Sequence, residues 1–163
     1  MKRDGTFNEA SFDREYESKW SGSREDAFFS GELFDAGRVL KSSEHEYSKR
    51  SSRQSYYVIA ADVGRKGCDT VAVVLKVNPQ INGDSTKSLV NIYTWSDEHF
   101  EVQAIKLKKL YYKYKARRLV IDANGLGIGL VDFMVKSQED PETKDFYPDF
   151  GVYNDNDNEY KKF

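Results

Sequence analysis

The sequence has one cysteine, two histidines and no long apolar run, and each shortage excludes a class of protein. Cys68 alone cannot form an internal disulfide or a multi-cysteine zinc site, which is typical of a reducing cytoplasm. His45 and His99 are too isolated in the sequence to support nucleophilic or zinc chemistry, and surface positions are expected for both. No segment approaches the roughly 20 apolar residues of a membrane span, and the N-terminus lacks the apolar core of a signal peptide. We therefore expect a soluble protein that is not secreted, in which any bound metal ion is held by oxygen atoms.

The chain also lacks a charge excess of either sign. Its 25 Lys and Arg residues and 27 Asp and Glu residues give a net charge of −2. No overall field therefore draws it onto nucleic acid or an anionic membrane, and any DNA contact must be local. The phosphate-binding sequence GxxxxGK[ST] is absent as well, which excludes a P-loop ATPase within this chain.

A change of composition near residue 55 predicts two parts. Residues 1–55 have few β-branched residues, and the polar run at 41–55 indicates a linker. Before that run, the apolar residues of segment 26–40 predict a short helix or docking segment that packs on something. Residues 56–163 are expected to form a single domain with one core.

Three β-rich segments follow the predicted linker. YYVIAADV, TVAVVLKV and SLVNIYTW predict strands at 56–63, 70–77 and 88–95, and the short connections between them favour an antiparallel meander. The first segment is almost entirely apolar, which indicates a central strand buried on both faces.

The rest of the chain alternates helix and strand. Apolar residues at spacings of three and four predict an amphipathic helix from Phe100 to about residue 116. RRLVIDANG then predicts a fourth strand, parallel to the first because the helix provides the crossover. A second helix is expected at about 126–137 and a short strand at 149–153. The predicted fold is α/β, with an RNase H-like mixed sheet (a three-stranded antiparallel meander plus parallel strands) flanked by helices.

Two acids stand at the carboxyl ends of the predicted parallel strands. Asp62 ends the first strand and Asp122 ends the fourth, each after an apolar run. If these strands are neighbours, the carboxylates lie side by side, and a divalent cation would offset their repulsion. The competing interpretation is that each Asp merely begins a turn. The matched pair favours metal binding, with Asp62 and Asp122 as catalytic metal ligands.

The residues around these acids have weaker signals. Asp69 is expected to shape the hairpin, although it lies close enough in sequence to touch the metal site or DNA. Gly125, Gly127 and Gly129 match a dinucleotide-binding loop poorly. They either let the second helix approach the sheet closely and leave space for a DNA backbone, or serve packing alone.

Basic residues suggest two places for DNA contact. Arg65 and Lys66 follow Asp62 directly and are the preferred DNA-binding candidates. The run KLKKLYYKYKARR at 106–118 could neutralise phosphates, but a solvated helix face is the favoured interpretation of it.

Three longer segments carry a family resemblance. They are FDREYESKWSG with DAFFSGELFDAGRVL, then YYVIAADVGRKGCDTVAVVLKV, then RRLVIDANGLGIGLVDFMV, together covering most of residues 12–135. In these segments the chain resembles the C-terminal nuclease domain of tailed-phage terminase large subunits, which is RNase H-like, or RuvC-like. The first resembles the connection between motor and nuclease, and the other two resemble the strands that carry the first two metal-binding acids, matching Asp62 and Asp122.

The resemblance implies cleavage of double-stranded DNA with two Mg²⁺ or Mn²⁺ ions during genome packaging. It also implies a virus- or prophage-encoded protein in the host cytoplasm, with an ATPase motor domain, the portal and the small terminase subunit as partners and no membrane partner. Against the family pattern, the ATPase domain is expected to be missing from this chain, and the domain at 56–163 is expected to be truncated before its third acid. The candidates to replace the third acid are Asp132, Asp149, Asp155 and Asp157, but none lies in a comparable motif.

Two other functions stay open. The same strand order occurs in sugar-kinase and actin-like ATPases, in which a hairpin resembling DVGRKGCDT holds phosphate. Alternatively, a chain lacking the third acid is catalytically incomplete and only binds packaging partners such as the portal or small terminase.

Overall fold

The computed structural model describes residues 31–48, 54–81, 83–123 and 125–153, in two units, Met1–Lys41 and Ser42–Phe163. In the first unit, the expected helix within 26–40 is the short helix α2 (Gly31–Ala36), while residues 26–30 lie outside the described residues. Leu33 and Phe34 of α2 are exposed. Among the described residues, no helix is both long and apolar enough to cross a membrane.

The second unit begins its sheet with the predicted meander. Strands β1 (Tyr56–Asp62), β2 (Asp69–Pro79) and β3 (Ser85–Ser96) pair in sequence, each antiparallel to the next. The register between β2 and β3 shifts between Val74 and Leu75. The three strands are confirmed, and the two longer ones extend a few residues beyond their predicted ends.

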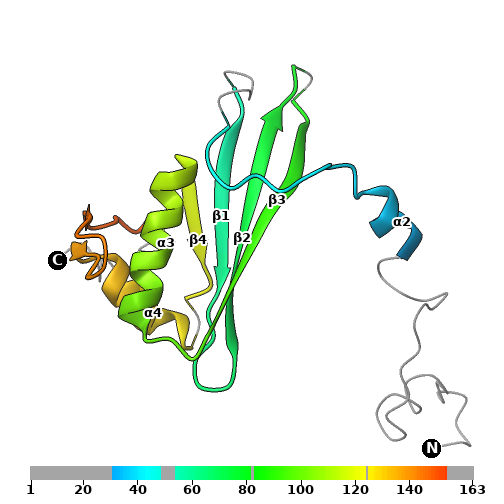
Figure 1. The fold of residues 1–163 in the computed structure, drawn as a ribbon. Helices are drawn as coiled ribbons and strands as arrows, with labels where there is room; N and C mark the ends of the chain where they lie inside the picture. The colour runs from blue at the N-terminus through cyan, green and yellow to red at the C-terminus, as the bar shows by residue number, and fades with distance from the viewer. Residues whose placement is uncertain (1–30, 49–53, 82, 124, 154–163) are drawn as a thin grey trace, which may run out of the picture. The chain divides into compact units, whose positions relative to one another are not determined.

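The helix α3 (Phe100–Tyr114) carries the chain across one face of the sheet, as its apolar spacing predicted. It ends at Lys115, whose left-handed backbone (φ 49°) turns the chain back. Strand β4 (Arg118–Ile121) then pairs parallel to β1, giving the order β3-β2-β1-β4 (Figure 1). The fold is therefore α/β with a mixed sheet that has one parallel pair.

After β4 the chain forms helix α4 (Gly127–Met134) and a small hairpin of β5 (Gln138–Glu139) and β6 (Phe146–Tyr147). The prediction of a short strand at 149–153 is wrong. That segment has no regular structure, because Phe150 turns inward, donating its amide to the carbonyl of Met134 (3.0 Å) and packing against the Tyr111 ring (4.9 Å between centroids).

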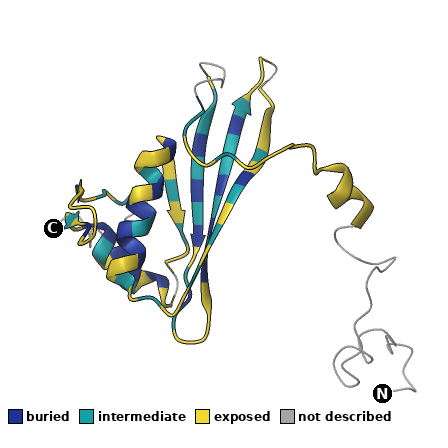
Figure 2. Cartoon of the chain, in the orientation of Figure 1, coloured by how far each residue is buried: buried dark blue, intermediate teal, exposed yellow. Residues whose placement is uncertain are grey.

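The core lies between the sheet and the helices (Figure 2). Alternate residues of β1 are fully or nearly fully buried. Leu107 of α3 and Leu130 of α4 belong to the same buried cluster, and both side chains are 0% exposed. Burying each such leucine contributes about 1.5–3 kcal/mol. The buried cluster consists of Tyr57, Ile59, Ala61, Ala72, Val74, Val90, Ala104, Leu107, Leu110, Tyr114, Ala116, Leu130 and Met134.

The opposite face of the sheet is much less covered by the described residues. Val58 and Ala60 of β1 are only half-buried there, and Ile92 and Val120 on the edge strands are each 53% exposed. The expectation that the first strand is buried on both faces is therefore wrong for the described part of the chain. β1 is central in the sheet, between β2 and β4, but only its helix-facing side chains are fully or nearly fully buried.

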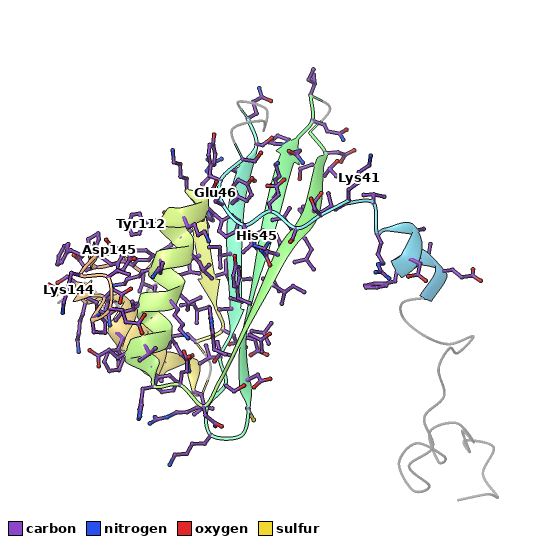
Figure 3. All side chains as sticks on the ribbon, in the orientation of Figure 1. Lys41, His45, Glu46, Tyr112, Lys144 and Asp145 are labelled. Carbon is purple, nitrogen blue, oxygen red and sulfur yellow. The ribbon has the colours of Figure 1, made fainter. Side chains whose placement is uncertain are left out.

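Part of the predicted linker packs on this unit. In segment 42–48, Glu44 accepts hydrogen bonds from the Tyr57 hydroxyl and from Lys76 Nζ (2.8 Å), and its amide donates to the carbonyl of Val90 (3.0 Å). Burial alone would lower the pKa of Lys76, but the hydrogen bond to Glu44 helps to raise it. Figure 3 shows the neighbouring His45 on the same segment. The Tyr47 amide donates to the carbonyl of Lys113 in α3 (3.1 Å), so the segment covers the core between β3 and α3.

A carboxylate also fixes the hairpin that follows α4. Asp140 Oδ1 accepts the amides of Glu142 (2.9 Å) and Thr143 (3.4 Å), and Oδ2 pairs with Lys109 Nζ (3.3 Å). The backbone hydrogen bond from Glu142, with those from Thr143 and Lys109, lowers the Asp140 pKa to about 2.

This lowered pKa predicts an acid-dependent contribution to stability. The pKa of Asp140 in the folded protein lies below its ordinary value of 3.8. The ionised carboxylate therefore contributes fully to the free energy of unfolding above pH 3.8, and this contribution is lost as the pH falls toward 2. We expect the difference in unfolding free energy between the parent protein and Asp140→Asn to shrink over this range in urea titrations. Glu142→Gln, at an exposed neighbouring position, is the control for removing a charge. A difference that does not change with pH would contradict the assignment.

Candidate active site

The register of the sheet brings Asp62 and Asp122 together. Ala61 pairs with Ile121 in the parallel β1–β4 ladder, and the next step along both strands is Asp62 beside Asp122. The Asp122 amide donates to the carbonyl of Ala61 (3.3 Å), so the pairing continues past the end of β4. Since neighbouring strands lie about 4.8 Å apart, the two residues are adjacent.

Both acids lie on the less covered face of the sheet. Tyr57, Ile59 and Ala61 point to the helices, so Asp62 shares the other face with Val58 and Ala60. Residues in register across a parallel pair share a face, which places Asp122 on it too. Both residues are exposed, so solvent and a ligand can reach them.

The turn after Asp62 is held by buried polar groups. The Gly64 amide donates to Thr70 Oγ1 (2.8 Å), Thr70 Oγ1 and Gln103 Oε1 are 2.8 Å apart, and Gln103 Nε2 donates to the Gly64 carbonyl (3.1 Å). Thr70 is 0% and Gln103 1% exposed, so loss of either partner would leave buried polar atoms unpaired. Neither role was predicted from the sequence. A polar residue on the apolar side of the helix was the available signal for Gln103.

The turn following Asp122 depends on glycine. A Cβ at Gly127 would lie 1.8 Å from the carbonyl oxygen of Asp122, and one at Gly129 would lie 2.7 Å from the Phe100 ring. Gly125 has a φ of +60°, which favours glycine. The close approach of α4 to the Asp122 backbone and to α3 thus requires small residues, as expected from the sequence.

The other candidates near Asp62 have separate surroundings. Arg65 is half-buried, with its guanidinium 4.9 Å from the centroid of the Phe100 ring, and Lys66 is exposed in the same turn. Asp69 begins β2 and accepts a hydrogen bond from Ser96 Oγ (2.6 Å), which fits the expected hairpin role. Asp69 therefore has a structural partner at the neighbouring strand.

Among the described residues, no group of three or more His, Cys, Asp or Glu side chains could hold a metal ion. Of the suggested third acids, Asp132 is exposed on α4 and Asp149 lines a groove beside β4, while Asp155 and Asp157 lie outside the described residues. The geometry thus brings together two acids, Asp62 and Asp122. His45 and His99 are exposed, as expected.

The basic run at 106–118 does not form one solvated face. Lys108 is fully buried, its ammonium donates to the carbonyl of Lys136, and burial lowers its pKa to about 8 despite the nearby Asp149. Lys106 pairs with Glu98 and Lys109 with Asp140. The favoured interpretation from the sequence is thus wrong for Lys108 and incomplete for its neighbours.

Comparison with known protein families, curated proteins and solved structures finds no match for this chain.

The close approach at Gly127 predicts a large effect of a single methyl group. Gly127→Ala should lower the unfolding free energy by about 2–4 kcal/mol, because α4 or the Asp122 turn must move. Chemical denaturation measures this. Gly151→Ala is the matched control, since nothing lies within 4 Å of its added Cβ, and it should change stability by about 0.5 kcal/mol or less. Equal stabilities of the two variants would contradict the packing described for α4.

Proposed function

We propose that this chain is a divalent-metal-dependent endonuclease domain of the RNase H-like class, related to the nuclease domain of phage terminase large subunits, which hydrolyses phosphodiester bonds of double-stranded DNA. The observation that carries the proposal is the in-register pair Asp62 and Asp122 at one end of the less covered sheet face. The sheet order β3-β2-β1-β4, with β1 and β4 parallel, also fits this class.

The donor set suits Mg²⁺ or Mn²⁺. Both ions prefer oxygen ligands, and Mg²⁺ is commonly held by one or two carboxylates together with water and substrate phosphate. Asp62 and Asp122 supply two adjacent, accessible carboxylates, and their mutual repulsion favours a shared cation. When bound, such an ion lowers the pKa of a bound water and stabilises charge on a phosphate.

The chain's own groups then have distinct tasks. Asp62 and Asp122 would hold the metal at the strand ends, and the glycines after Asp122 keep its turn compact. Lys66 is exposed in the turn after Asp62, where it is available to bind DNA phosphates, and Arg65 lies in the same turn. The Thr70–Gln103 hydrogen bonds hold this turn in place.

The phosphate-binding hairpin of an actin-like or sugar-kinase ATPase is less well supported. Its turn amides would have to face a phosphate, but the Gly67 amide donates to Asp97 Oδ1 (2.7 Å) and the Gly64 amide to Thr70. A chain that only binds portal or small-terminase partners would have no need for two adjacent acids. It is distinguished by the activity test below.

The proposal predicts metal-dependent nicking of supercoiled plasmid DNA by the full chain. Asp62→Asn and Asp122→Asn should each lower the rate at least about a hundredfold, because the neutral amide no longer offsets the cation charge. Asp69→Asn, which changes an acid bonded to Ser96, is the matched control and should retain most activity. Gel electrophoresis with Mg²⁺, Mn²⁺ and EDTA measures nicking. Cleavage that survives in both Asp62→Asn and Asp122→Asn would remove these residues from the mechanism.

A further inference from the structure

A groove of about 720 Å³ runs along the outer edge of β4. Within the described residues β4 pairs only with β1, so its other edge faces this groove. The last part of α3 and segment 149–153 form the remaining lining. The groove reaches Ile121, the residue before Asp122, and its volume lies within the range of about 300–1,000 Å³ typical of ligand sites.

The lining combines cations with aromatic rings. The guanidinium of Arg118 lies 5.0 Å from the centroid of the Tyr153 ring within the lining. Arg117 also lines the groove, and its guanidinium lies 5.0 Å from the centroid of the Tyr56 ring, which is outside the lining. Tyr153 is 90% exposed and Tyr112 44%. Among the described residues neither arginine has a carboxylate within ion-pair distance, so both charges can meet a ligand. The lining has one acid, Asp149, against these two cations.

The aromatic and cationic surface continues around α3. A second hollow of about 620 Å³ shares Tyr112 with the groove and is lined also by Lys113 and Phe146, the latter 67% exposed. Figure 3 shows Tyr112 on the side of α3 that faces Lys144 and Asp145 of the C-terminal hairpin. Tyr112 stacks on Tyr147, which also lines the second hollow (5.8 Å between centroids).

We propose that the β4 groove binds a single strand of nucleic acid. Arginines attract the phosphates, and exposed tyrosine rings give the bases a surface for stacking, which is the combination used to hold single strands. An added peptide strand fits less well, because β4 offers only four residues for backbone pairing. The inference deepens the proposed nuclease function and rests on it for the role of the strand. This would be an unpaired portion of the DNA substrate, leading from the groove toward Asp122.

Binding is measured by fluorescence anisotropy of a labelled oligothymidylate with the full chain in EDTA, where no metal-dependent cleavage occurs. Tyr153→Ala should weaken binding about tenfold, whereas Tyr153→Phe, which keeps the ring, should not. Arg118→Ala should also weaken binding and reduce the slope of log affinity against log salt by about 0.7. Lys87→Ala, at an exposed position on the opposite edge strand β3, is the control for loss of a charge.

The results separate this inference from the nuclease function. Asp62→Asn should bind the oligothymidylate as the parent does, while losing plasmid nicking. Plasmid nicking without oligothymidylate binding would overturn the groove assignment alone, and binding without nicking would leave it standing while the catalytic proposal fails. Equal losses in Arg118→Ala and Lys87→Ala, no effect of Tyr153→Ala, or capture of an acidic peptide in place of the oligothymidylate would each overturn it.

Discussion

The parallel pairing of β1 with β4 is the constraint on which the candidate site depends. The Arg117 amide bonded to the Tyr57 carbonyl (2.8 Å) begins the pairing, and the Asp122 amide bonded to the Ala61 carbonyl ends it. A slip of one residue would send Asp122 to the opposite face of the sheet, away from Asp62. The crossover through α3, packed on the core by Leu107 and its neighbours, sets this register. The metal binding proposed at Asp62 and Asp122 therefore depends on the packing of α3 against the core.

The two faces of the sheet contribute differently. The helix side contains nearly all of the fully buried apolar residues, together with polar anchors such as Glu44 and Gln103. The other side has half-buried aliphatic side chains and ends in the two acids. Leaving that face open within the described part of the chain costs hydrophobic stabilisation, but it keeps both carboxylates accessible. Stability and access are thus divided between the two faces of one four-stranded sheet.

Most of the framework was predictable because it follows from patterns along the sequence. Apolar runs predicted β1, β2 and β3, helical spacing predicted α3, and the crossover length predicted the parallel β4. The adjacency of Asp62 and Asp122 followed from that order. Contacts between distant segments left no such pattern. Glu44 lies in a polar run, yet it accepts hydrogen bonds from Tyr57 and Lys76. Lys108 lies among other lysines, yet it is fully buried and donates to the carbonyl of Lys136. Segment 149–153 resembles a strand in composition, but packing of Phe150 on Tyr111 outweighs that preference.

The central claim is that Asp62 and Asp122 share a cation. The most direct measurement is the anomalous difference density of a crystal of the full chain soaked in manganese. If they do, a peak is expected within about 2.0–2.6 Å of a carboxylate oxygen of each residue, the range of metal–oxygen distances at such sites. A fully soaked crystal with no peak between these carboxylates, or with manganese bound only at other acids, would contradict it.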